Sequence, residues 1–95
     1  MVNEQDEVVL GGKAAQVLDS TVFLEAKKRI RDGIESQMLA VPLSDQTMHT
    51  RLIVALQVWG QIEKYLENIK QTGEIRQFQI TQEEERKKHW FQRFG

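Results

Sequence analysis

"MHTRLIVALQVWGQIEKYLENI", residues 48–69, carries the longest regular pattern in the chain and predicts how it folds. Its apolar residues recur at alternating steps of four and three, and Leu56 and Tyr65 widen the stripe that they form. The members of that stripe are Met48, Leu52, Ala55, Trp59, Ile62, Leu66 and Ile69. This spacing is the heptad seam of a helix that packs lengthwise on another helix. The stretch therefore predicts a long helix over residues 45–72.

Residues 20–41 predict a second long helix, which precedes the first. Its apolar residues are also three or four apart, at Phe23, Ala26, Ile30, Ile34, Met38 and Val41. Asp19 or Ser20 can cap its start, and Pro42 excludes the helical conformation for the residue before it. The short turn after Pro42 makes the two helices antiparallel neighbours, which is a helical hairpin.

The ends of the long helix and the place where the two helices cross are also predicted. Asp45 or Ser44 can cap its start, and Gly73 can end it in the left-handed conformation. A glycine inside a helix costs about 1 kcal/mol relative to alanine and is best explained by a close neighbour. We therefore expect a tight helix crossing at Trp59 and Gly60.

The segment before the hairpin predicts a leader and a short helical turn. Residues 1–12 are acidic and end at Gly11-Gly12, which indicates a flexible joint. "GKAAQVLDS", residues 12–20, predicts one or two helical turns that fold back over the end of the long helix. A second copy of the chain could cover that end instead, since two-helix units commonly dimerise into four-helix arrangements. The hairpin domain is placed at residues 13–73.

The segment after the hairpin predicts a connector and a short closing helix. "EIRQFQI", residues 74–80, alternates apolar and polar residues, as in an extended connector or a strand that pairs with another molecule. Thr81 and Glu84 have the spacing of a capping box, so residues 81–95 predict a C-terminal amphipathic helix. The predicted fold is all-α: an antiparallel helical hairpin with a short N-terminal helical turn and an extended linker to a short C-terminal helix.

Composition limits the functions that the chain can have. There are 13 Lys and Arg against 14 Asp and Glu, so no overall charge attracts nucleic acid or an anionic membrane. There is no cysteine, which excludes disulfides and thiolate metal sites. The acidic start is the reverse of a secretory signal, and no apolar run reaches the roughly 18 residues of a membrane span. We expect one small soluble, intracellular domain that is near the lower size limit for a self-sufficient core.

No motif predicts catalysis, a metal or a cofactor. His49 and His89 lie on different predicted helices, and neither has a carboxylate three or four residues after it on its own face. Residues 83–85 are adjacent glutamates that fan around a helix and cannot converge as an acid and a base. Gly11-Gly12-Lys13 lacks the rest of a phosphate loop. We therefore expect a protein that is not an enzyme and has no cofactor.

The closing segment "KKHWFQRFG", residues 87–95, combines aromatic and basic residues. Aromatic residues with arginine are the usual anchors of protein interfaces, so we expect this segment to dock on a protein partner. The predicted contact residues are Phe78, Arg86, Lys87, Trp90, Phe91, Arg93 and Phe94. In the alternative, these rings cap the chain's own hairpin. A membrane and nucleic acid are not the expected partners, because anchors need a longer apolar face and stacking platforms are usually sheets or grooves.

Residues 14–75 resemble the small helical-hairpin proteins found among the structural genes of tailed bacteriophages. The resemblance lies in an apolar step before the first helix, the turn "PLSD" at residues 42–45, Arg51 near the start of the second helix and Thr72-Gly73 at its end. It implies a homo-oligomeric virion or morphogenesis component that attaches to capsid, portal or tail proteins, in the host cytoplasm and the virion. A phage-encoded inhibitor or adaptor of a host protein and a weak nucleic-acid-binding accessory protein are the alternatives.

Overall fold

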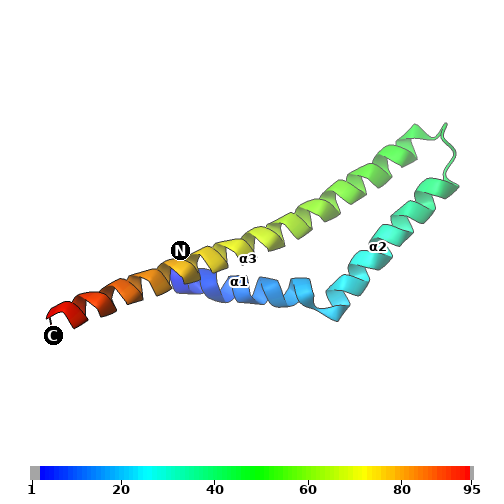
Figure 1. Ribbon diagram of the computed structural model, residues 1–95. Helices are drawn as coiled ribbons and strands as arrows, with labels where there is room; N and C mark the ends of the chain where they lie inside the picture. The colour runs from blue at the N-terminus through cyan, green and yellow to red at the C-terminus, as the bar shows by residue number, and fades with distance from the viewer. Residues whose placement is uncertain (1–2, 95) are drawn as a thin grey trace.

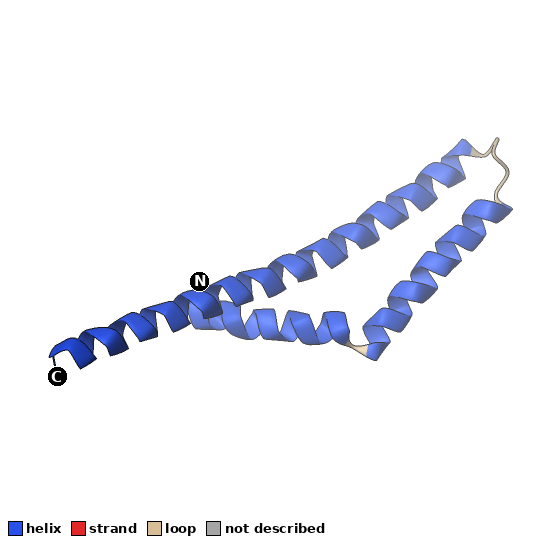
Figure 2. Ribbon diagram, viewed as in Figure 1, coloured by secondary structure: helices blue, strands red, loops and turns tan. Residues whose placement is uncertain are grey.

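The residues that the structure describes form helices joined by short turns. The computed structural model describes the backbone of residues 3–94, and the side chains of residue 3 and residues 5–90. Three helices follow one another: α1 (Glu4–Asp19), α2 (Thr21–Ala40) and α3 (Gln46–Phe94), as Figures 1 and 2 show. No strand occurs among residues 3–94. The predicted all-α class is confirmed.

One helix sets the length of the molecule. α3 contains 49 residues, and at 1.5 Å rise per residue it is about 74 Å long. The molecule measures 77 × 24 × 21 Å, so α3 runs along its whole length, while α1 and α2 lie one after the other beside it (Figure 1). The fold is a rod.

The predicted connector and the separate C-terminal helix are wrong. Residues 74–80 continue α3 without a break, and no glycine among residues 3–94 has a positive φ, so Gly73 does not end a helix. Thr81 is not an N-cap, because its Oγ1 donates to the Gln77 carbonyl oxygen at 3.0 Å, one turn back along the same helix. Threonine makes this bond inside helices, where the carbonyl lies within reach of its hydroxyl.

The predicted flexible leader is also wrong where the structure describes it, since α1 begins at Glu4 and includes both Gly11 and Gly12. Asn3 caps the helix, with Oδ1 accepting the Asp6 N–H at 2.8 Å. α1 then runs antiparallel beside α3, as Figure 1 shows. The turn predicted at residues 12–20 does fold back onto the long helix, but it is only the second half of α1.

Gly11 and Gly73 mark the place where α1 and α3 touch. Both are buried. A Cβ on Gly11 would lie 2.7 Å from the Gly73 Cα, and a Cβ on Gly73 would lie 2.7 Å from the Gly11 Cα. Real Cβ atoms do not approach a backbone carbon that closely, so only glycine at both positions permits this crossing. By contrast, a Cβ on Gly60 would meet nothing within 4 Å, and the predicted crossing at Trp59 and Gly60 is wrong.

The predicted limits of α2 are confirmed. Ser20 caps it, with Oγ accepting the Phe23 N–H at 3.1 Å. Val41, before Pro42, is extended, with φ −80° and ψ 130°. Asp45 caps α3, with Oδ1 accepting the Met48 N–H at 3.1 Å. His49 closes the turn, because its Nε2 lies 3.2 Å from the carbonyl oxygens of both Val41 and Pro42. Since neither oxygen can donate, Nε2 carries the hydrogen.

α2 faces α3 through side chains, whereas α1 touches α3 through its backbone. The six apolar residues that predicted the inner face of α2 are all half-buried. The Phe23 and Trp59 rings stack with centroids 5.8 Å apart, and Lys27 Nζ lies 2.9 Å from Glu63 Oε2. Close backbone approaches to α3 are far fewer along α2 than along α1. α1 and α3 are therefore the most closely packed pair of helices. The hairpin prediction had instead paired α2 with α3.

The predicted seam of α3 divides between two faces. Leu52 is buried, and Leu56, Trp59 and Leu66 are half-buried against the other helices. Met48, Ile62 and Ile69, which the same pattern placed inside, are exposed. Ala14 and Leu52 are the only buried apolar side chains among those described, and both remain slightly exposed. The chain alone thus has very little core.

The glycine crossing leads to a direct test. Gly73→Ala should lower the free energy of unfolding by about 1–3 kcal/mol, because the new Cβ meets the backbone of α1 and forces the helices apart. Gly60→Ala is the matched control, and it should raise that free energy by about 0.5–1 kcal/mol, since it removes a helical glycine from open space. Urea unfolding followed by circular dichroism, at one protein concentration, measures both. Equal stability of the two variants would show that the crossing does not hold the fold together.

Candidate functional site

The C-terminal part of α3 extends beyond the helix that packs beside it. Arg76 Nε lies 2.6 Å from Glu7 Oε2, which ties the start of α1 to this point of α3. α1 begins three residues earlier, at Glu4, and Ile80 is the last half-buried residue of α3 among the described side chains. Residues 81–90 are all exposed. Residues 81–94 therefore form an arm, which Figure 1 shows projecting past the N-terminus.

The arm holds the residues predicted to contact a partner, but it does not gather them into one cluster. Phe78 and Arg86 lie together and line a shallow depression of about 340 Å³ with Gln79, Gln82 and Glu83. Lys87 and Trp90 are one helical turn apart and share another face. Trp90 follows Phe78 by twelve residues, which turns it about 120° around the helix axis. Phe78 and Trp90 therefore present two different faces of α3.

Three of the predicted contact residues lie at the end of the arm. The backbone of Phe91, Arg93 and Phe94 belongs to α3, but their side chains lie outside the residues whose side chains the structure describes. The four that are described, Phe78, Arg86, Lys87 and Trp90, are all exposed. Trp90 is 58% exposed although it is a large apolar ring. The alternative in which these rings cap the chain's own hairpin receives no support from Phe78 and Trp90.

The charges of the arm change sign along its length. Residues 83–85 are glutamates, and residues 86–88 are Arg, Lys and Lys, all of them exposed. Basic side chains near the C-terminus of a helix interact favourably with its dipole. The order of charges therefore favours a helical arm, and its basic residues 86–88 precede Trp90 along the helix.

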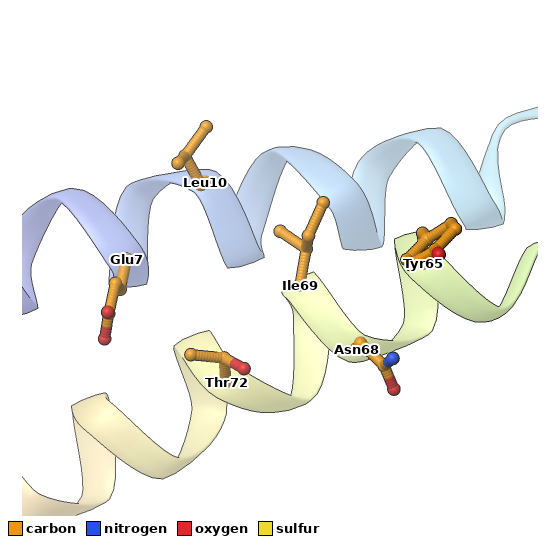
Figure 3. A pocket seen from close by; sticks show the side chains of 6 residues that line it. All are labelled: Glu7, Leu10, Tyr65, Asn68, Ile69 and Thr72. Atoms are coloured by element: carbon orange, nitrogen blue, oxygen red, sulfur yellow. The ribbon is translucent and has the colours of Figure 1, made fainter. Parts of the chain in front are cut away.

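A second depression lies between α1 and α3, and sequence reasoning missed it. It has a volume of about 310 Å³, and Figure 3 shows the side chains that line it: Glu7, Leu10, Tyr65, Asn68, Ile69 and Thr72. It was missed because residues 1–12 were expected to be a flexible leader. The helical spacing of Leu10, Ala14 and Val17 is the signal that could have revealed α1 as an amphipathic helix.

The described side chains do not assemble a metal site. Among them, no three histidine or carboxylate groups lie close enough together to hold an ion. His49 lies against the carbonyl oxygens of the turn between α2 and α3, and His89 is exposed on the arm.

Comparison of the chain with protein-family models, with curated proteins and with solved structures gives no match. Within the part of the chain that the structure describes, none of the helices combines the length and the apolar character that crossing a membrane requires.

The ion pair at the base of the arm can be measured by a double-mutant cycle of Glu7→Gln and Arg76→Gln. Both side chains are partly exposed, so we expect a coupling energy of at most about 1 kcal/mol. The coupling should shrink as salt rises from about 0.1 M to 1 M, where the Debye length falls from about 10 Å to 3 Å. The pair of Glu25 and Arg29, within α2 and more exposed, is the control and should couple more weakly. If the cycle gives no coupling energy at low salt, the contact between Glu7 and Arg76 is contradicted.

Proposed function

We propose that this protein is a non-enzymatic structural or assembly protein, and most concretely a small virion or morphogenesis component of a tailed bacteriophage. In this role it docks to larger virion proteins, such as capsid, portal or tail proteins, through the C-terminal arm of α3. The observation that carries the proposal is the arm itself. It is a helix that extends beyond α1 and exposes Trp90 among basic residues.

The chemistry of the arm suits a protein groove. A helix that docks in a groove uses apolar anchors spaced by three, four or seven residues. Trp90 and Phe94 are four residues apart, and Lys87 precedes Trp90 by three. Tryptophan and arginine are the residue types most enriched among the energetic anchors of interfaces. Residues of these types on an overhanging helix favour insertion into a site on a larger protein.

The lack of a core also favours an assembly role. The chain exposes 7985 Å², whereas a compact monomer of 11.1 kDa exposes about 5,700 Å². The excess of about 2,300 Å² exceeds what one partner contributes to a standard interface, which is about 800 Å². A chain with so much uncovered surface, much of it apolar, is expected to gain stability from other subunits.

The connection to tailed phages rests on the resemblance of residues 14–75. Its supporting features are the apolar step before α2, the turn at residues 42–45 and Arg51 near the start of α3. The helix continues through Thr72-Gly73 and does not end there. The resemblance therefore supports the proposal through its first helix and its turn.

The proposal is tested with purified portal, capsid and tail proteins of the phage that encodes the chain. Deletion of residues 81–95 should abolish binding and retain most of the helical circular dichroism, because α1, α2 and the packed part of α3 remain. Trp90→Ala should weaken binding by about 30-fold or more, the effect of losing one anchor of about 2 kcal/mol. Glu84→Gln, an exposed change on the same arm about 120° around the helix from both Phe78 and Trp90, is the control and should bind normally.

Four outcomes would overturn the proposal. Unchanged binding after the deletion would remove the arm from the interface, and loss of folding would show that the arm supports the chain's own helices. Selective binding to one host protein in place of virion proteins would establish the inhibitor. Affinity for nucleic acid that falls steeply with salt would establish the nucleic-acid-binding alternative.

A further inference from the structure

A second apolar stripe runs along α3 beside the face that packs on α1 and α2. Its residues are spaced by four, four, three and four, which keeps them on one side of a helix. Each is between 42% and 66% exposed. They are Val54, Val58, Ile62, Tyr65 and Ile69.

The neighbouring surface has the composition of a buried helix. Residues 52–62, "LIVALQVWGQI", contain no charged side chain over three turns of α3. A helix that packs on one side only normally carries charged residues on the other, whereas one that is apolar on most sides is buried. α2 covers only one side of this segment, and Ile53, Val54 and Val58 remain exposed. The composition thus anticipates a second neighbour for α3.

The stripe extends onto α1. Leu10 is 47% exposed and lines the depression with Tyr65 and Ile69 (Figure 3). Val17 follows Leu10 by seven residues, lies on the same side of α1, and is also exposed. The surface is therefore a band across two helices, with a hollow at one end, and the hollow has room for a side chain from a partner.

The stripe is nearly symmetric about its own midpoint. Counted from a point just before Ile62, Val58 and Tyr65 lie at equal distances along the helix, and so do Val54 and Ile69. When two copies of α3 pack antiparallel through this stripe, the apolar residues of one copy therefore lie opposite apolar residues of the other. A two-fold dimer requires a surface that is complementary to itself in this way.

We propose that a second copy of this chain packs on the stripe, with the two α3 helices antiparallel and a two-fold axis near Ile62. Val54 of one copy lies opposite Ile69 of the other, and Val58 lies opposite Tyr65 at the hollow beside Leu10. The dimer adds a quaternary structure to the proposed assembly role, and its biological role rests on that proposed function. Its physical basis is the excess surface of about 2,300 Å² per chain, which exceeds the roughly 800 Å² that each partner of a stable interface buries.

The antiparallel direction is favoured over the parallel one by charge and by size. Parallel helices in register would bring Arg51 against Arg51 and Tyr65 against Tyr65, whereas antiparallel helices bring Arg51 opposite Thr72. Like charges that face each other across an interface are destabilising. With α1 and α2 of each copy on the adjacent face of its α3, the dimer becomes a helical bundle. Its two arms project from opposite ends.

The test uses the full chain, which has no cysteine of its own, so that introduced cysteines report single contacts. Ile62→Cys should form a disulfide-linked dimer on mild oxidation, because the two copies of this residue meet at the axis. Val54→Cys should not link to itself, but it should link to Ile69→Cys when the two variants are folded together. Glu67→Cys is the control and should stay unlinked, since it is exposed and about 140° around the helix from Ile62.

Light scattering of the unmodified chain and of charge variants provides the second measurement. The wild-type mass should be that of a dimer, and Ile62→Glu should reduce it to that of a monomer at the same concentration. Gln71→Glu adds the same charge about 180° around the helix and should leave the dimer intact. If Ile62→Glu unfolds the chain, the cysteine variants still decide the matter.

The proposed dimer is contradicted if the wild-type chain is a monomer or if Ile62→Glu remains a dimer. It is also contradicted if Val54→Cys forms a disulfide with a second copy of itself, because that would show that the two α3 helices are parallel. This failure is separate from failure of the proposed function. If the chain were monomeric but still bound a virion protein through Trp90, only the dimer proposal would be contradicted. A cross-linked dimer that bound no virion protein would remove the docking role and keep the interface.

Discussion

The contact between Gly11 and Gly73 is the constraint on which the rest of the architecture depends. With no Cβ on either residue, the backbones of α1 and α3 meet at a distance that no other pair of residues permits. Glu7 and Arg76, one turn beyond the crossing, then fix how far α1 extends along α3. Residues 81–90 of α3, which follow Ile80, are all exposed. The length of the arm therefore follows from the positions of Gly11 in α1 and Gly73 in α3.

The same crossing explains why the apolar residues of α3 serve two purposes. α1 and α2 lie in succession along one face of α3, where they cover Leu52, Trp59 and Leu66. The adjacent face keeps Val58, Ile62 and Tyr65 exposed. A rod of three helices encloses little volume, so most of its apolar area stays near the surface. An antiparallel dimer would cover the second face and leave the arms at its two ends, where they can reach larger proteins.

Much of the fold could be predicted because local signals decide helix limits. Ser20, Pro42 and Asp45 act on backbone groups within a few residues, and their positions were predicted correctly. The inner face of α2 followed from its spacing for the same reason. Gly11 and Gly73 were misread because a glycine near a helix end and a glycine at a helix crossing look the same in sequence. Thr81 and Glu84 were likewise misread, since the same spacing occurs inside a continuous helix.

The sequence by itself determined that the chain is helical, where α2 begins and ends, and where aromatic and basic residues gather. Only the tertiary structure decided that residues 74–80 belong to one helix with residues 46–73, that α1 is the closest partner of α3, and that Ile62 and Ile69 stay exposed. The physical reason is that periodicity specifies which residues share a face but not which neighbour covers that face. That choice depends on how closely two backbones can approach, and here it depends on Gly11 and Gly73, which are distant in the chain.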